Sequence, residues 1–246
     1  MALESATRRM DGGLVNDRPD LPPLGASVEA DTLGAAIRER LSAMLAAGRP
    51  PLDEELDELF AAVDRFHEAV FAVTEVFTVR CARGCANCCS QMVYDVGDFE
   101  IDRIGRRLAE EGRTAEVREA LAARDVIWSE VRGATPRRRA ESDDEWIERT
   151  ALAFWSKDVP CALLGENGEC TVHDVRPWSC RRSFAGSDPD LCRGEHARDP
   201  RRRFFTLSAY ETFDEELGAL DSWAPFAADS DRLDRALLRW IEAHGD

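Results

Sequence analysis

Apolar residues recur at helical spacing through the first third of the chain. They stand four residues apart from Leu33 to Leu45, and Gly48 follows where a helix would end. The next stretch is also apolar on one face only, which predicts a second long helix. That face consists of Leu56, Leu59, Phe60, Val63, Phe66, Val70 and Val73. The end of this helix, "VFAVTEVFTVR", is rich in β-branched residues and suits an extended segment equally well.

Three further helices are predicted in the middle of the chain and one at its end. Asp98 is placed to cap the first, and Gly112 ends it. Thr114 is placed to cap the second. Ser142 and Glu145 have the spacing of a capping box for the third. The final helix is predicted by the apolar stripe Leu233, Leu237 and Trp240.

The segment "CALLGENGECTVH", residues 161–173, has a different pattern. Two short apolar runs flank an Asn-Gly pair, which is typical of a β-hairpin turn. Pro177 follows at a position that suits the first turn of a short helix. Strands and helices do not alternate along the chain. We therefore expect a mainly α fold, a helical domain with a small β-hairpin and a cysteine-rich metal-binding core.

These patterns divide the chain into four regions. Residues 1–27 are rich in proline, glycine and charge, which predicts a disordered N-terminal arm. N-terminal helices are expected over 28–79, and a cysteine-cluster metal-binding domain over 80–192. Residues 193–246 are expected to form a C-terminal helical extension that packs on the same domain.

Composition narrows the class of partner and the compartment. The 246 residues include 48 acidic and 32 basic side chains, a net charge of −16, which repels phosphate backbones and argues against nucleic acid as a partner. The N-terminus lacks the apolar stretch of a secretory signal. No run approaches the about 18 apolar residues of a membrane span. We expect a cytoplasmic protein with no membrane partner, in which thiols stay reduced.

The eight cysteines carry the strongest chemical signal. All of them fall between residues 81 and 192, in two sets of four. Small buried thiols would not cluster in this way, and a disulfide framework is disfavoured in a reducing compartment. The pattern therefore indicates metal or iron–sulfur ligation. The expected ligands are Cys81, Cys85, Cys88, Cys89, Cys161, Cys170, Cys180 and Cys192.

The first set lies in "RCARGCANCC". Spacings of two or three residues let one short loop wrap around an ion, and Gly84 permits the tight path that this needs. The side chains of adjacent residues tend to diverge. Cys88 and Cys89 therefore either serve two metals, or one is a ligand and the other has a separate role.

The second set complements the first. Cys161 and Cys170 are expected at opposite ends of the hairpin, and Cys180 near a helix N-terminus, where backbone N–H groups favour a thiolate. His173 is an alternative ligand or a second-shell group, and the residues alone leave this open. Nearby arginines are positioned to offset the charge of the thiolates. They are Arg80, Arg83, Arg176, Arg181 and Arg182.

Two blocks carry a family resemblance. "CARGCANCC" resembles the CxxxCxxCC motif of the YkgJ-type cysteine-cluster family of zinc- or iron-chelating proteins, and "PCALLGENGECTVHDVRPWSCR" is similar to that family's downstream block. The helix "DVGDFEIDRIGRRLAEEG" also resembles the family. The likeness spans about residues 80–185. It implies that the first seven cysteines form the cluster and leaves Cys192 outside the core pattern.

Two functions follow as expectations. The first is a metal-binding protein that holds zinc or an iron–sulfur cluster and presents a surface to a protein or peptide. The second is an iron–sulfur-dependent enzyme that modifies a peptide or protein, since the family includes flagellin lysine-N-methylases. No nucleotide-binding or zinc-protease motif is present, and the residues name no catalytic group, substrate or oligomeric state.

Radical S-adenosylmethionine enzymes share the CxxxCxxC spacing but fit poorly. Asn87 stands where they usually have an aromatic residue, and a fourth cysteine follows at once. Their repeated strand–helix units are also missing from the pattern. Zinc and iron remain equally compatible with a set of thiolate ligands.

Overall fold

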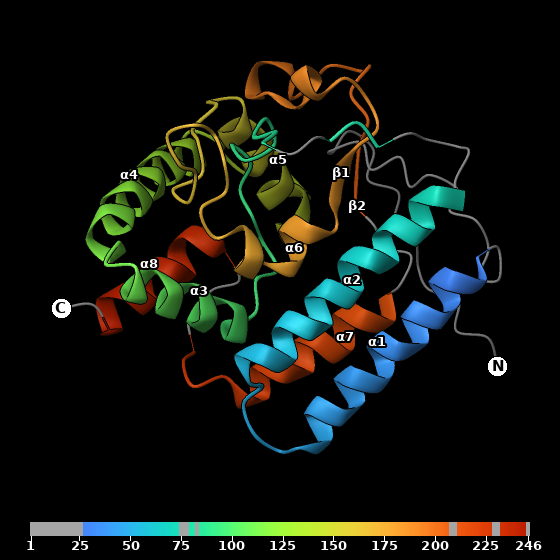
Figure 1. Ribbon diagram of the computed structural model, residues 1–246. Coiled ribbons are helices and arrows are strands. Elements are labelled where there is room, and N and C mark those ends of the chain that lie inside the picture. Colours follow the sequence, from blue (N-terminus) through green and yellow to red (C-terminus); the bar gives the residue numbers. More distant parts are fainter. Residues whose placement is uncertain (1–26, 74–78, 82–83, 207–210, 228–231, 245–246) are drawn as a thin grey trace.

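The computed structural model describes residues 27–73, 79–81, 84–206, 211–227 and 232–244 (Figure 1). In chain order the longer helices are α1 (Val28–Ala46), α2 (Asp53–Val73), α3 (Asp98–Glu110), α4 (Thr114–Gly133), α5 (Asp143–Trp155), α7 (Glu211–Ala219) and α8 (Leu233–His244). The short elements are η1 (His173–Val175), α6 (Trp178–Arg181), β1 (Ser183–Ala185), η2 (Pro189–Cys192), η3 (Gly194–His196), β2 (Phe204–Thr206) and η4 (Leu220–Trp223). The expected mainly α fold is confirmed.

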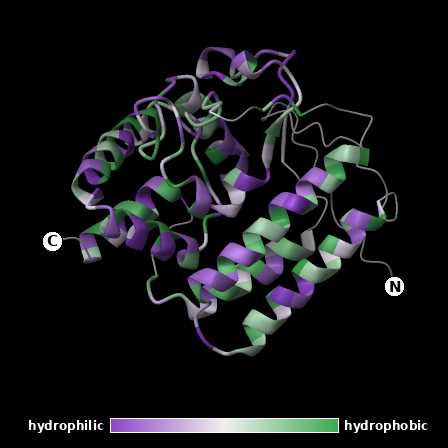
Figure 2. Ribbon diagram, in the orientation of Figure 1, coloured by the Kyte–Doolittle hydropathy of each residue, from purple (hydrophilic) through white to green (hydrophobic). Residues whose placement is uncertain are grey.

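Helices α1, α2 and α7 lie side by side as one layer (Figure 1). Ser27 caps α1 by accepting a hydrogen bond from the backbone N–H of Ala30 at 3.1 Å. Each helix of the α1–α2 pair has an apolar and a polar face (Figure 2). The apolar faces meet in one cluster that contains fully buried side chains from all three helices. These include Ile37, Leu41, Leu59, Phe66 and Phe213.

Helices α3, α4 and α8 form a second packed group. At the α3–α8 crossing, a Cβ on Gly105 would come within 2.2 Å of the Trp240 ring, so only glycine allows this approach. The Trp240 indole N–H donates to Asp102 at 3.0 Å beside it. Helix α5 packs on the far side of α4. Its predicted capping box between Ser142 and Glu145 is present.

The expected β-hairpin over 161–173 is not confirmed. Only one isolated bridge, between Leu164 and Cys170, forms there, and the turn is closed by the Gly165 N–H donating to the Glu169 carbonyl at 2.8 Å. The two strands that do pair in the described part of the chain are β1 and β2, antiparallel. The Asn-Gly signal marked a tight turn correctly, but the flanking runs are too short for a ladder.

Two helix starts differ from the prediction by one residue. Gly97, not Asp98, caps α3, and Arg113, not Thr114, precedes α4. In α3 the backbone N–H of Gly97 donates to the Glu100 carboxylate, so the carboxylate three residues later closes the first turn. The expected arm lies outside the described residues except for Ser27, and the proposed four-region division stays a prediction. None of the described helices has the length and apolar character needed to cross a membrane.

Candidate metal centre

The first cysteine segment is held against the stretch that follows α6. The backbone N–H of Arg80 donates to the Ala185 carbonyl at 2.8 Å, and the Ala185 N–H donates to Cys81 Sγ at 3.2 Å. The Asn87 side-chain amide donates to the Pro189 carbonyl at 2.8 Å. These contacts bring "RCARGCANCC" beside η2, which ends at Cys192.

Helix α6 positions Cys180 although it is only four residues long. The backbone N–H of Trp178 donates to the buried Glu100 carboxylate at 2.6 Å, which fastens the start of α6 to α3. Arg181 is also buried, donates to Asp64 on α2 at 3.0 Å, and lies over the Phe60 ring. Cys180 is therefore held between contacts to both helical groups.

Four partly buried thiols from three separate segments lie near one another, and we call them the buried thiol group. It consists of Cys89, Cys161, Cys170 and Cys180. Burial raises the pKa of Cys180 well above its usual value, and repulsion from the other three thiols raises it further. Burial likewise raises the pKa of Cys161 to about 12. The mutual effects show that these thiols lie close enough to interact electrostatically.

The remaining cysteines form an outer thiol group, made up of Cys81, Cys85, Cys88 and Cys192. Burial raises the pKa of Cys192 to about 11, with further contributions from Cys81 and Cys85. Cys88 packs against Cys192 in a small apolar cluster around Ala185. Cys192, which the family resemblance left outside the core pattern, thus lies with the cysteines of the first segment.

Cys88 and Cys89 connect the two groups. The pKa of Cys89 is raised, first by a hydrogen bond with the Cys88 thiol and then by burial. The expected divergence of these neighbours is therefore incomplete, because their thiols touch while Cys88 also packs on Cys192. A helix N-terminus was expected to favour the thiolate form of Cys180, but the pKa of this thiol is raised, so the expectation is wrong. Burial outweighs any effect of the short helix α6.

Few of the five predicted arginines face the thiols. Arg176 lowers the pKa of Cys89, Cys170 and Cys180 against the effect of burial. Arg181 is turned toward Asp64, and Arg182 lies 3.6 Å from Asp95. Arg80 is placed by its backbone bond to Ala185, and Arg83 lies outside the described residues.

Arg124 on α4 is the residue that sequence reasoning missed. Its side chain is buried, and its Nε lies 2.9 Å from the equally buried Asp234 carboxylate. The guanidinium also donates to the carbonyls of Gln91, two residues after Cys89, and of Val159 and Pro160, which precede Cys161. Arg124 thereby joins two segments that supply thiols. The available signal was a charged residue on the apolar stripe between Leu121 and Trp128.

Two of the four histidines, His173 and His67, contact groups other than the thiols. His173 Nε2 lies 3.0 Å from a guanidinium nitrogen of Arg176, and burial and that cation lower the His173 pKa. A neutral ring that accepts from Arg176 fits this contact. His67 is buried in α2, stacks on Trp178, and has a pKa lowered by burial to about 4.

The donor set suits a soft metal, although its side chains are not arranged around one point. All eight cysteines are free thiols. Within the described ranges, no three Cys, His, Asp or Glu side chains form a group ready to hold a metal ion. Binding would therefore require thiols to deprotonate and turn toward the ion, with Arg124 and Arg176 as the neighbouring positive charges. Four thiolates fit Zn²⁺ or an iron–sulfur cluster.

On comparison with known proteins, residues 80–198 match the family model described as "CxxCxxCC: Putative zinc- or iron-chelating domain". The match contains all eight cysteines, Cys192 included. Searches of the curated proteins and of the solved structures each returned no match.

Proposed function

We propose that this protein binds metal and that the buried thiol group is its primary site, since residues 80–198 match the family model of zinc- or iron-chelating domains with clustered cysteines. Cys89, Cys161, Cys170 and Cys180 would each supply one thiolate. Four thiolates complete the coordination of one zinc ion or of one [4Fe–4S] cluster.

The observation that carries the proposal is that three other thiols lie near enough to Cys180 to raise its pKa. Cys89 comes from the first cysteine segment, 91 residues before Cys180. Cys161 and Cys170 come from the loop before η1, 19 and 10 residues before Cys180. Chance burial of small residues does not gather thiols from such distant segments. Desolvation and mutual repulsion make these thiols unfavourable as free thiolates, and a bound cation would relieve both effects.

The outer thiol group is the candidate for a second ion. Cys81, Cys85 and Cys192 interact with one another, and Cys88 lies between them and the buried group. Cys81 is exposed to solvent, whereas every cysteine of the buried group is at least partly buried, as are Cys85, Cys88 and Cys192. We therefore expect the outer site to be the weaker one, or to exchange its metal faster.

Elemental analysis and a visible spectrum, taken on full-length protein purified without oxygen, choose between the metals. One or two zinc ions per chain without visible absorbance would identify a zinc protein. Several irons with broad absorbance near about 400 nm would identify an iron–sulfur cluster. Protein that folds fully and carries neither metal would overturn the proposal.

Matched serine variants test the assignment of the primary site. Cys180→Ser and Cys161→Ser should abolish stoichiometric metal at the buried group, whereas Cys192→Ser should leave it in place and affect only the outer group. Equal loss in all three variants would contradict two distinct groups. Full retention in Cys180→Ser would contradict the buried site.

The enzymatic alternative is a second proposal, an iron–sulfur-dependent enzyme that modifies a peptide or protein. One observation favours it over a purely structural module. Asp125 and Arg235 line a cavity of about 480 Å³. They adjoin in sequence the buried pair Arg124 and Asp234, and Arg124 donates to carbonyls next to the cysteine segments. A binding cavity next to a metal site is what a catalytic module needs. Mass spectrometry of peptides incubated with the metal-loaded protein would detect such modification.

A further inference from the structure

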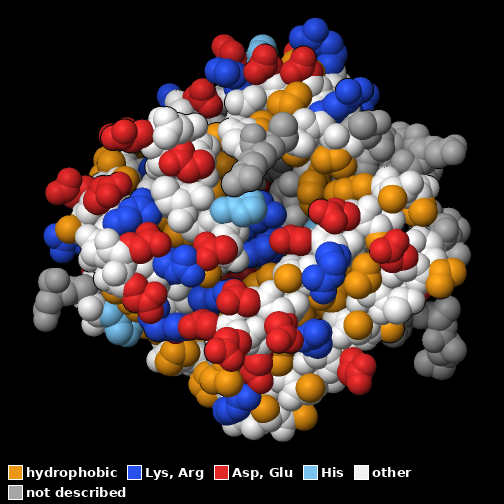
Figure 3. All heavy atoms as spheres, in the orientation of Figure 1, with side chains coloured by type: hydrophobic (Ala, Val, Ile, Leu, Met, Phe, Trp, Pro, Cys, Tyr) orange, Lys and Arg blue, Asp and Glu red, His pale blue; other side chains and the backbone are white. Residues whose placement is uncertain are grey.

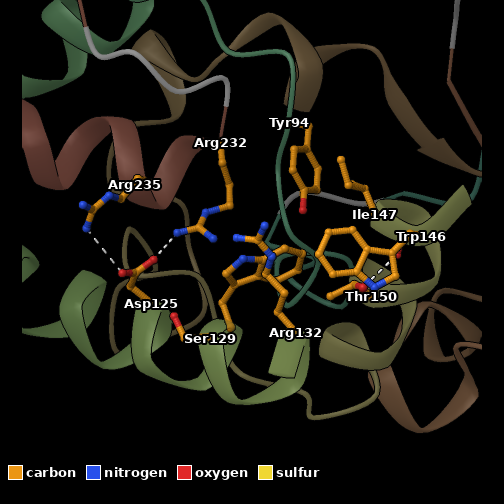
Figure 4. Close-up of a pocket in the computed structure, with 10 residues that line it drawn as sticks. Tyr94, Asp125, Ser129, Arg132, Trp146, Ile147, Thr150, Arg232 and Arg235 are labelled. Atoms are coloured by element: carbon orange, nitrogen blue, oxygen red, sulfur yellow. Dashed lines mark hydrogen bonds and ion pairs between the residues drawn. The ribbon is translucent and has the colours of Figure 1, made fainter. Parts of the chain in front are cut away.

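A cationic cavity lies between α4, α5 and the start of α8 (Figure 4). Its volume, about 480 Å³, exceeds what a bare inorganic anion needs and falls in the range of small-molecule sites. Its walls combine charged, hydroxyl and aromatic side chains. They are Tyr94, Asp125, Trp128, Arg132, Trp146 and Arg232, together with Ser129, Ile147, Thr150 and Arg235.

The charge of the cavity is opposite to that of the protein. Three arginines face one aspartate, an excess of two positive charges, in a chain whose net charge is −16. On the face that Figure 3 shows, acidic and basic side chains are interspersed. Arg232 and Arg235 share the single carboxylate of Asp125.

Two of the arginines are held in place by tryptophan rings. The guanidinium of Arg232 lies 5.2 Å from the centre of the Trp128 ring, and that of Arg132 lies 5.0 Å from the centre of the Trp146 ring. In Figure 4 both guanidinium groups point into the same space from opposite walls. A cation–π contact of this kind restrains the guanidinium, and the in-plane N–H groups of Arg132 can then donate to an oxyanion.

Trp146 is itself fixed. Its indole N–H donates to the Thr135 carbonyl at 2.6 Å, and Arg137 lies over the same ring system at 4.7 Å. The support for Arg132 is thus built from α5 and from the loop that precedes it. A preorganised donor of this kind binds with little loss of side-chain entropy.

From these observations we propose that the cavity binds a small organic oxyanion. Its phosphate or carboxylate group is held by Arg132 and Arg235, with the positive charge of Arg232 beside them, and its body lies against Tyr94 and Ile147. Ser129 and Thr150 supply hydroxyl groups to the same ligand. The proposal stands on the cavity alone and does not depend on which metal the thiols bind.

Isothermal titration calorimetry on the full chain tests it with matched probes. The probes are 1-naphthyl phosphate, 1-naphthoate, neutral 1-naphthol and inorganic phosphate. At least one organic anion should bind about tenfold or more tighter than 1-naphthol, the difference expected for one charge-assisted hydrogen bond. The tighter of the two anions assigns the headgroup as phosphate or carboxylate.

Variants locate the binding. Arg132→Gln and Arg235→Gln should each weaken the anion about tenfold, whereas Arg118→Gln, on an exposed part of α4 outside the cavity, should not. Arg132 is exposed, so its replacement is expected to leave folding intact, which circular dichroism checks.

Three results would overturn the proposal. They are equal affinity for 1-naphthol and the organic anions, unchanged affinity in both cavity variants, or no binding of any organic anion at millimolar concentration. If inorganic phosphate binds as tightly as the organic anions, the organic body has no place in the site and the ligand class is wrong.

Discussion

The layer of α1, α2 and α7 and the cysteine-bearing region are stabilised by different means. The helical layer buries a large continuous set of aliphatic and aromatic side chains. Around the outer thiol group, by contrast, the described residues form a small apolar cluster with Ala185 and Cys192 as its buried members and Cys88 packed on them. There, backbone hydrogen bonds and very short elements such as α6 and β1 set the path of the chain.

This contrast indicates where metal matters for stability. The helical layer gains its free energy from apolar burial, which needs no ligand. The surroundings of the outer thiol group have little apolar area of their own and resemble small modules that need a staple to hold their shape. Cys161 and Cys170, by contrast, pack against the large apolar cluster of α3, α4 and α8. We therefore expect metal binding and local folding to be coupled around the outer thiol group only.

Metal removal should have the largest effect. After chelation under reducing conditions, amide hydrogens in residues 84–91 and 183–192 should exchange much faster, while those of α2 keep their protection. Hydrogen exchange followed by mass spectrometry measures both regions in one sample. A uniform change across both regions, or none, would show that the contrast is wrong.

Arg124→Met should come next, because it leaves the buried Asp234 carboxylate and three carbonyls without their shared donor. Breaking a buried pair in this way costs about 3–5 kcal/mol of unfolding free energy. Metal affinity should fall as well, since Gln91 and Pro160 adjoin the thiol segments. Urea unfolding and metal titration measure the two effects. Arg118→Met on the same helix is the control and should change neither.

Leu59→Ala tests the helical layer by itself. Leu59 is fully buried in the α1–α2–α7 cluster, and loss of such a side chain costs about 2–5 kcal/mol. Metal content of the folded protein should remain unchanged, which distinguishes this variant from Arg124→Met. Glu68→Ala, at an exposed position of α2, should shift the urea midpoint little. Lower metal content in folded Leu59→Ala protein would mean that the two regions are not separable.

The smallest effect is a pH dependence that arises from Glu100. Burial raises the pKa of this carboxyl to about 7, although the N–H groups of Trp178 and Gly97 oppose the shift. The folded state therefore holds the proton more tightly than the unfolded state, and stability contributed by the protonated form is lost as pH rises from about 4.5 to 7. The loss is at most about 3 kcal/mol.

Glu100→Gln should remove this contribution and flatten the dependence of stability on pH in that window. Thermal unfolding at several pH values, compared with the exposed Glu68→Gln, measures it. A slope that is the same in both variants would show that Glu100 does not titrate as described. If metal retention also falls in Glu100→Gln, the contact with Trp178 positions Cys180 in addition to stabilising α6.

Much of the helical architecture could be predicted from the sequence because its signals are local. The apolar spacing from Leu33 to Leu45 and the Ser142–Glu145 capping box each depend on residues within one or a few turns. The 161–173 turn was placed correctly but not its strand character, since pairing depends on neighbours that a short segment does not contain. The Asp98 cap was wrong by one residue because Glu100 serves Gly97 instead.

The candidate site divides in the same way. The sequence by itself determined the number of thiols, their two sets and the kind of metal they suit, because ligand chemistry belongs to the residue type. Only the tertiary structure decided that Cys89 lies with Cys161, Cys170 and Cys180, and that Cys192 lies with Cys81 and Cys85. That grouping depends on Arg124, Glu100 and Asn87, whose contacts join residues 33 to 110 positions apart. Contacts over such separations leave no periodic or local pattern in the chain, so only folding reveals them.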